Sequence, residues 1–325
     1  MHFFTSPTIL ISPLLAIALI LLVLKRKQRN KAKRLRRESK IWSIGIYEGT
    51  DPLTFSPATG VLNPIITALD ITDIKARFVA DPFMLWQNGA WHLFFEVLNN
   101  DRNKGEIGYA QSPDLVTWEY GGIVLKEKFH LSYPYVFAHE GETYMIPECA
   151  KSNAVRLYRA SGFPIQWDYV APLIQNKSRH APLIDPSIVR HNSHWYLFSY
   201  ARKLKNLHLF TAETLTGSWK EHPASPIVTA SERFSRPAGR IVSNEDCLYR
   251  YAQDDNPRYG SKVWAFKITE LTPESYHEEP CPGGPVVGVG SAPWHNAGMH
   301  NVDPHRMKDG RWFAIVDGLE DKQIK

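Results

Sequence analysis

The sequence is poor in cysteine. Cys149, Cys247 and Cys281 are its three cysteines in 325 residues, and no two of them have CxxC or other metal-ligand spacing. An odd count without such spacing argues against a disulfide framework and agrees with a reducing compartment. We therefore predict no metal site from ligand spacing and no disulfide-stapled scaffold.

Residues 41–325 also lack any long segment with the 3.6-residue hydrophobic period of an amphipathic helix. What they have instead is aromatic residues, at 12% of the whole chain with 10 Trp, together with 20 Gly and 23 Pro in that chain. This composition is typical of many short strands joined by turns. We therefore expect an all-β domain.

Positive charge is scarce outside one short stretch. Residues 25–40 hold ten of the 38 Lys and Arg side chains and one of the 33 acids, so the rest of the chain has 28 basic and 32 acidic residues. The basic pI therefore belongs to this stub, and the globular part is mildly acidic. A nucleic-acid-binding surface is not expected from such a distribution.

Residues 1–24 contain no charged side chain, and residues 8–24 are long and apolar enough to span a thin bilayer. A cleaved signal peptide is the alternative, but it needs a basic start and a small-residue cleavage site, whereas here the apolar run is followed by KRKQRNKAKRLRR. We predict a transmembrane anchor at 1–24, a basic juxtamembrane stub at 25–40 and a folded domain at 41–325. The positive-inside rule places that domain on the cytoplasmic side of a single-pass protein. The stub would then lie against anionic lipid or act as a solvated linker.

A repeat of about fifty residues runs through the folded part. In five segments a residue followed by proline begins a short apolar strand, a polar turn and an aromatic-rich second strand, as in ADPFMLWQNGAWHLFFE from Ala80. The prolines are Pro82, Pro134, Pro186, Pro237 and Pro304, at steps of 52, 52, 51 and 67. Trp118, Trp167 and Trp219 repeat in step after a third strand. Such a period is typical of repeat architectures, so we predict a five-bladed β-propeller rather than the alternative, a β-sandwich.

The last repeat is short, because the sequence given ends with DGLEDKQIK. The segment IWSIGIYEG at residues 41–49, which precedes the first repeat, has the character of a strand. We expect it to supply the outer strand of the fifth blade and so to close the ring.

The first strand of each blade lines the channel of a propeller, and the second strand returns to the same face. Residues before the five prolines and at the ends of the second strands should therefore meet in one funnel. The first set is Asp81, Tyr133, Asp185, Arg236 and Asp303. The second set is Glu96, Glu148, Tyr200, Gln253 and Asp317, with His130 and His300 as expected neighbours.

A funnel of carboxylates, an arginine and aromatic rings suits a polyhydroxylated ligand. Carboxylates accept strong hydrogen bonds from hydroxyl groups, and aromatic faces cover the apolar faces of a sugar ring. Paired carboxylates also perform glycosidic bond cleavage, with one as acid and the other as base or nucleophile. Structural roles remain the alternative for each position, since Asp before Pro often caps a turn. No cofactor is evident, and a divalent cation in the central channel stays open.

Several runs resemble the N-terminal domain of plant glucosamine inositolphosphorylceramide transferases over residues 42–318. They are ADPF, FFE, HLSYPYVF, YMIPE, LYRA and RPAGRIV. The resemblance implies a propeller associated with glycolipid synthesis. The plant enzymes carry a separate glycosyltransferase domain after this one, so their transferase activity does not carry over to this chain, and a separate glycosyltransferase is the expected partner.

More distantly, the chain is similar to the five-bladed propellers of family 43 glycoside hydrolases. That resemblance implies Asp81 as a catalytic base and Asp185 as a residue that tunes a pKa. The acid expected in blade four is missing, because Ser235, Arg236 and Pro237 stand there. An arginine does not release its proton at useful pH. Glu148 or Glu96 would have to be the proton donor.

Three functions follow from these residues. The first is an enzyme acting on a glycosidic or sugar-phosphate bond, with Asp81, Asp185 and Glu148 as catalytic residues. The second, which the missing acid favours, is a module that binds a carbohydrate or glycolipid headgroup at the membrane. The third is a protein-binding scaffold. A cytoplasmic position would favour lipid-linked sugars or nucleotide sugars as ligands.

Overall fold

The computed structural model describes residues 21–29, 39–175 and 182–323. The chain divides into two units, Met1–Lys40 and Ile41–Lys325. In the first unit, residues 21–29 are helical and exposed. The predicted anchor at residues 1–24 lies outside the described residues except for its last four. Within the described part of the chain, no helix combines the length and apolar character needed to cross a bilayer.

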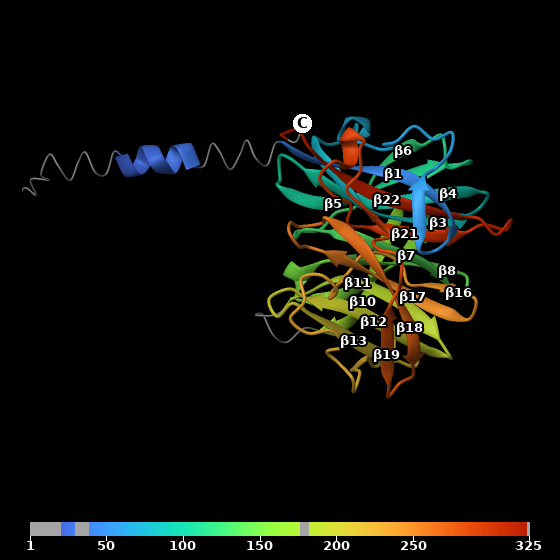
Figure 1. The fold of residues 1–325 in the computed structure, drawn as a ribbon. Coiled ribbons are helices and arrows are strands. Elements are labelled where there is room, and N and C mark those ends of the chain that lie inside the picture. The colour runs from blue at the N-terminus through green and yellow to red at the C-terminus, as the bar shows by residue number, and fades with distance from the viewer. Residues whose placement is uncertain (1–20, 30–38, 176–181, 324–325) are drawn as a thin grey trace, which may run out of the picture. The chain divides into compact units, whose positions relative to one another are not determined.

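The unit Ile41–Lys325 forms five antiparallel sheets, the blades of a propeller (Figure 1). Blade one comprises β3 (Ala76–Gln87), β4 (Ala90–Asn99), β5 (Lys104–Ser112) and β6 (Glu119–Leu125). Blade two comprises β7 (Ser132–His139), β8 (Glu142–Glu148), β9 (Ala154–Gly162) and β10 (Gln166–Gln175). Blade three comprises β11 (Leu183–His191), β12 (His194–Ala201), β13 (Asn206–Ala212) and β14 (Lys220–Glu221). The all-β five-bladed prediction is confirmed.

Blade four is the irregular one, because its inner strand is interrupted. It comprises β15 (Arg236–Pro237), β16 (Val242–Asn244), β17 (Cys247–Asp254), β18 (Lys262–Leu271), β19 (Tyr276–Pro280) and β20 (Val287–Gly288). Between β15 and β16, Gly239 has a φ of 139°, and a Cβ there would lie 1.7 Å from the Val302 carbonyl oxygen. Glycine thus lets the backbones of blades four and five touch at the centre.

Blade five joins the two ends of the domain. Its order from the centre is β21 (Val302–Arg306), β22 (Trp312–Asp321), β1 (Lys40–Asp51) and β2 (Thr54–Pro57). The predicted closure by residues 41–49 is confirmed, although β1 is the third strand of the blade and β2 lies outside it. Three short 3₁₀ helices lie in the connections: η1 (Ala68–Asp70), η2 (Ala150–Ser152) and η3 (Pro293–His295).

The apolar core lies between neighbouring blades. One cluster unites Phe94 of blade one with Tyr135 and Trp167 of blade two, and the rings of Phe94 and Trp167 meet edge to face at 5.4 Å. Such contacts combine large buried area with favourable ring geometry. They explain why each repeat carries aromatic residues on its second and later strands.

The residue before proline has the same unusual backbone in three blades. Asp81, Tyr133 and Asp185 have positive φ values of 52°, 46° and 49°, and the strand register shifts at each of them. Left-handed conformations are uncommon for residues other than glycine and concentrate at functional sites. Each is a bulge that places its residue at the central axis.

Candidate functional site

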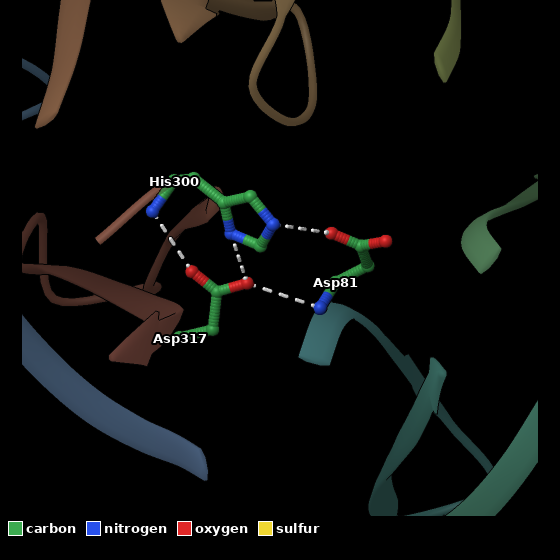
Figure 2. A group of neighbouring side chains, drawn as sticks. All are labelled: Asp81, His300 and Asp317. Atoms are coloured by element: carbon green, nitrogen blue, oxygen red, sulfur yellow. Dashed lines mark hydrogen bonds and ion pairs between the residues drawn. The ribbon is translucent and has the colours of Figure 1, made fainter. Parts of the chain in front are cut away.

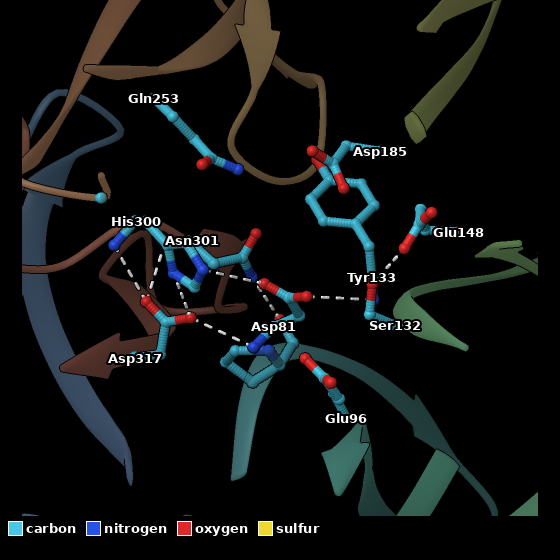
Figure 3. Close-up of polar contacts among 12 residues, drawn as sticks. Asp81, Glu96, Ser132, Tyr133, Glu148, Asp185, Gln253, His300, Asn301 and Asp317 are labelled. Carbon is cyan, nitrogen blue, oxygen red and sulfur yellow. Dashed lines mark hydrogen bonds and ion pairs between the residues drawn. The ribbon is translucent and has the colours of Figure 1, made fainter. Parts of the chain in front are cut away.

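The bulges and the ends of the second strands meet at one end of the channel, as Figure 3 shows for residues from all five blades. We call this region the funnel. It contains two groups of acidic and basic side chains. The first is the triad Asp81, His300 and Asp317, and the second is the pair Glu96 and Glu148 around His130.

In the triad, His300 lies between two carboxylates (Figure 2). Its Nδ1 is 2.6 Å from Asp317 Oδ2, and its Nε2 is 3.4 Å from Asp81 Oδ1. The backbone fixes the same groups, because the amide of His300 donates to Asp317 Oδ1 and that of Asp81 donates to Asp317 Oδ2. All three residues are buried. Asp317 therefore orients both its partners.

Burial sets the protonation of this triad. Burial raises the pKa of Asp81 to about 7, with His300 opposing the shift and Asp317 and Asp185 adding to it. Burial alone would lower the pKa of His300, but the carboxylates of Asp317 and Asp81 outweigh it and raise that pKa. A histidine between two carboxylates can hold a proton near neutral pH and pass it to Asp81.

The same triad has donor atoms that all lie within 4.8 Å of one another, close enough to share a cation. Carboxylate oxygens and an imidazole nitrogen are suitable ligands for several divalent ions. His300 Nδ1, however, already lies within ion-pair distance of Asp317 Oδ2, at 2.6 Å. A cation in the channel therefore stays an open prediction.

In the second group, His130 faces two glutamates. His130 Nε2 is 3.5 Å from Glu96 Oε1 and 3.9 Å from Glu148 Oε2. The amide of Gly105 donates to His130 Nδ1, which places the ring proton on Nε2, toward the glutamates. Burial, with Lys151 adding to it, lowers the pKa of His130 to about 4, so the ring is neutral at pH 7.

The two glutamates differ in their surroundings. Glu148 accepts hydrogen bonds from the Ser132 hydroxyl at 2.7 Å and from the Ala150 amide at 3.1 Å. Glu96 Oε1 is buried and has no hydrogen-bond partner among the described residues. Burial, then the nearby Asp81 and Glu148, raises the pKa of Glu96 well above its ordinary value. Its surroundings therefore favour the protonated form of Glu96, whereas Glu148 already accepts two hydrogen bonds.

Arg236 stands in blade four at the position matching Asp81 and Asp185. Its Nε pairs with Asp185 Oδ2, and its Nη1 is 3.8 Å from Asp255 Oδ2. Its guanidinium also lies 5.0 Å from the centre of the Tyr259 ring. Burial alone would lower the pKa of Arg236, but Asp185 outweighs it and raises that pKa, so the side chain stays charged. The blade-four position thus supplies a fixed cation in place of an acid.

Two predicted funnel residues have other partners. Asp303 pairs with Arg240, Nε to Oδ1 at 2.6 Å, and with His305 Nε2 at 2.9 Å, and it accepts from the Met84 amide. The side chain of Tyr133 is fully buried, and its hydroxyl bonds to Ser187 and Gly239. Both side chains are fully buried against these partners, a set that we call the polar layer, and the prediction that they line the funnel stays a prediction. The backbone amide of Tyr133 donates to Asp81 Oδ2.

Arg240 holds this layer together across the blades. Arg240 Nη2 donates to the carbonyls of Val136 at 2.9 Å and Met84 at 3.2 Å, and so joins blades one, two, four and five through Asp303. Burial would raise the pKa of Asp303, but Arg240 and His305 outweigh it and lower that pKa, so the carboxylate stays ionised.

The remaining predicted residues border the site. Gln253 is buried and donates to the Pro237 carbonyl, while its Oε1 has no partner in the described part of the chain. Tyr200 is also buried, and burial raises the pKa of its hydroxyl, with the nearby Arg236 opposing the shift. Both side chains agree with a polar pocket wall.

Sequence reasoning missed three residues at the funnel. The ring of Trp42 stacks on His300 at 4.0 Å, and Tyr259 meets His300 edge-on at 5.3 Å. Asn301 donates to the Pro82 carbonyl, and its buried Oδ1 has no partner among the described residues. Trp42 lies in the closing strand that the sequence indicated, but its ring direction depends on β1 joining β22.

The family model described as "Glucosamine inositolphosphorylceramide transferase 1, N-terminal" matches residues 36–319. The curated protein named glucosamine inositolphosphorylceramide transferase 1 from Oryza sativa subsp. japonica is 37% identical over 300 residues, covering 85% of this chain and 40% of that protein. Its namesake from Arabidopsis thaliana is 32% identical, covering 85% and 39%. The chain thus spans about two fifths of the length of these relatives.

Solved structures with the same fold include glycoside hydrolases. A putative glycoside hydrolase from Parabacteroides distasonis matches with a TM-score of 0.58 at 14% identity, covering 82% of this chain and 96% of that one. A Bacteroides ovatus protein titled GH43B matches at 0.56 and 17%, covering 80% and 53%. An α-L-arabinanase from Cellvibrio cellulosa matches at 0.53 and 15%, covering 73% and 90%. At these identities the likeness concerns the fold alone.

Proposed function

This chain belongs to the glucosamine inositolphosphorylceramide transferase N-terminal family, and on that premise we propose that its funnel binds a sugar or glycolipid headgroup in the service of glycan or glycolipid synthesis. The observation that carries the proposal is the ion pair of Arg236 with Asp185. Arg236 is a permanent cation at the blade-four position, where the family 43 glycoside hydrolases that this chain resembles are expected to have their catalytic acid.

The chemistry of the funnel supports a polyhydroxylated ligand. Glu148 accepts hydrogen bonds from hydroxyl groups, Arg236 donates to oxygens, and Glu96 and His130 offer protons at the wall. Tyr259 is 46% exposed at the funnel and offers a ring face to a sugar. The relatives are named for glucosamine and for inositolphosphorylceramide, so we propose a glucosamine- or inositol-phosphate-bearing headgroup as the ligand.

The proposed membrane anchor precedes β1, the first strand of the propeller domain. Trp42 packs on His300, so β1 begins beside the funnel. We propose that residues 1–24 anchor the chain in a bilayer, with the propeller on the cytoplasmic side, and that the funnel takes headgroups from that bilayer. Exposed cations near the funnel, Lys151 and Arg202, would favour anionic lipid. A glycosyltransferase is the proposed protein partner.

Calorimetry on the full chain in detergent, with a panel of glucosamine, inositol phosphate and their conjugates, tests the ligand. We expect Glu148→Gln to weaken binding about tenfold, because one charged hydrogen-bond acceptor is lost. Glu140→Gln is the matched control, since Glu140 is an exposed glutamate in the β7–β8 turn. Equal affinities for both variants, or no binding by any member of the panel, would overturn the proposal.

Reporter fusions at the C-terminus test the orientation separately. We expect a signal from a reporter that is active only in the cytoplasm. A signal from the other side would remove the cytoplasmic assignment while leaving the calorimetric result untouched.

A hydrolytic or transferase-like enzyme is the second candidate, and one observation favours it. Asp81, with a pKa of about 7, lies in the same funnel as Glu96, whose pKa is raised well above its ordinary value by burial. Two carboxyl groups in different protonation states are what an acid and base pair needs. Product analysis on the same panel decides: release of sugar that Asp81→Asn abolishes, with binding retained, would establish catalysis.

A further inference from the structure

A cavity lies outside the funnel, near the junction of blades four and five. Its volume is about 580 Å³, within the range of small-molecule pockets. Residues of β1, β2, β18 and β20 and of the segments around them line it. None of the predicted site residues belongs to it, so it needs its own explanation.

The lining is positively charged. Arg258 and Lys262 line the cavity, and none of the described residues that line it is acidic. Lys262 Nζ is 4.0 Å from Asp254 Oδ2, outside the lining, so its charge is partly balanced. Arg258 is exposed and forms no ion pair with any described residue. The cavity therefore offers at least one uncommitted guanidinium to an anion.

The rest of the wall is mostly apolar. Tyr47, Phe55, Val287 and Met299 line it and are themselves buried against the core, while Val289 at its rim is 58% exposed. Binding of an apolar ligand is favourable at such a wall, because it removes apolar surface from water. One end of the cavity is thus suited to charge and the body to hydrocarbon.

His295 adds an independent sign of a ligand. It is 7% exposed, lines the cavity, and its buried Nδ1 has no hydrogen-bond partner among the described residues. Burial lowers the pKa of His295, with the Gly288 carbonyl opposing the shift, so the ring is neutral. A buried nitrogen without a partner is costly unless something binds to it.

One loop connects this cavity to the funnel. Arg258 lines the cavity, the next residue, Tyr259, packs on His300 and Trp42, and a Cβ on Gly260 would meet both of those side chains. The loop is held in shape by the Gly260 amide, which donates to Asp255 Oδ1. A ligand on Arg258 would therefore touch the same loop that borders the funnel.

We propose that this cavity binds a phosphate-bearing amphiphile, with the phosphate on Arg258 and an apolar chain against Phe55, Val287 and Met299. The site is separate from the proposed headgroup site. The same phosphate-bearing amphiphile could bind in this cavity or with its headgroup in the funnel. The test must therefore distinguish these two binding places.

The test is calorimetry of the full chain with n-alkyl phosphates from ethyl to octyl, below their micellar concentrations. Each buried methylene is expected to strengthen binding about fourfold, the equivalent of ~0.8 kcal/mol. Arg258→Ala should weaken octyl phosphate binding about tenfold. Lys203→Ala is the matched control, because it removes one exposed cation of the β12–β13 turn without touching the cavity.

Each outcome decides the inference. The inference is wrong if the affinity does not change with chain length or if octyl phosphate does not bind. It is also wrong if Arg258→Ala and Lys203→Ala weaken binding equally. Glu148→Gln separates the two sites: unchanged octyl phosphate affinity supports a distinct cavity, whereas a matching loss would assign the probe to the funnel. If no member of the headgroup panel binds but alkyl phosphates bind more tightly as their chain lengthens, only the proposed function is refuted.

Discussion

Arg236 of blade four pairs with Asp185 of blade three, and the two residues stand at matched positions, each directly before a proline. Both side chains are largely buried, with 15% and 2% of their surface exposed. Equivalent positions of neighbouring blades lie side by side at the axis, so opposite charges at these positions can form an ion pair. The pair decides the character of the funnel, because it removes Asp185 as a free acid and leaves Asp81 and the glutamates.

We expect Arg236→Ala to lower the free energy of unfolding by about 3 kcal/mol, because it leaves the Asp185 carboxylate buried without its partner. Urea denaturation measures this loss. The double variant Arg236→Ala with Asp185→Asn should recover part of it, since no uncompensated charge remains. A double variant that is as unstable as the sum of both single variants would show that the pair does not interact.

Stability should depend on pH through Asp81. Its pKa rises from 3.8 to about 7 on folding, chiefly through burial. Between these values the folded state keeps a proton that the unfolded state has lost, so stability falls as pH rises from about 4 to 7. Asp81→Asn removes this contribution, and its unfolding free energy relative to the parent should be higher at pH 8 than at pH 5. Asp168→Asn, at an exposed position, should show no such change between the two pH values.

Gly239→Ala should be strongly destabilising. A Cβ at this position would lie 1.7 Å from the Val302 carbonyl, at a φ of 139°, where the backbones of two blades touch. Thermal unfolding is expected to show a loss of more than about 3 kcal/mol. Gly141→Ala is the control, because its φ is also positive at 80° but no atom lies within 4 Å of the added carbon. It should cost about 1 kcal/mol, and equal effects would refute the role of close packing.

Trp42→Ala should affect both the ring closure and the funnel. The indole is 7% exposed and stacks on His300 at 4.0 Å. Truncating a buried tryptophan costs roughly 3–5 kcal/mol. Trp42→Phe keeps an aromatic face and should lose much less. NMR titration of the imidazoles should show a changed His300 signal in Trp42→Ala, and an unchanged one would mean that Trp42 only packs.

The sequence by itself determined the repeat, because the physics of each blade is local. A proline near the start of each inner strand, hairpin turns and alternating aromatic residues recur with the blade, so Pro82, Pro134 and Pro186 mark the blades in the sequence alone. The same periodicity indicated that Asp81, Asp185 and Asp317 approach one axis, and that residues 41–49 close the ring.

Only the tertiary structure decided what these residues touch. The sequence placed Asp303 beside Asp81, yet its inner strand lacks the bulge of blades one to three, and it pairs with Arg240 instead. Arg240, Trp42 and Tyr259 come from segments whose side-chain directions depend on how separate blades meet. Periodicity determines which strand a residue occupies, whereas partners at a shared axis depend on bulges and packing between blades, which no single repeat contains.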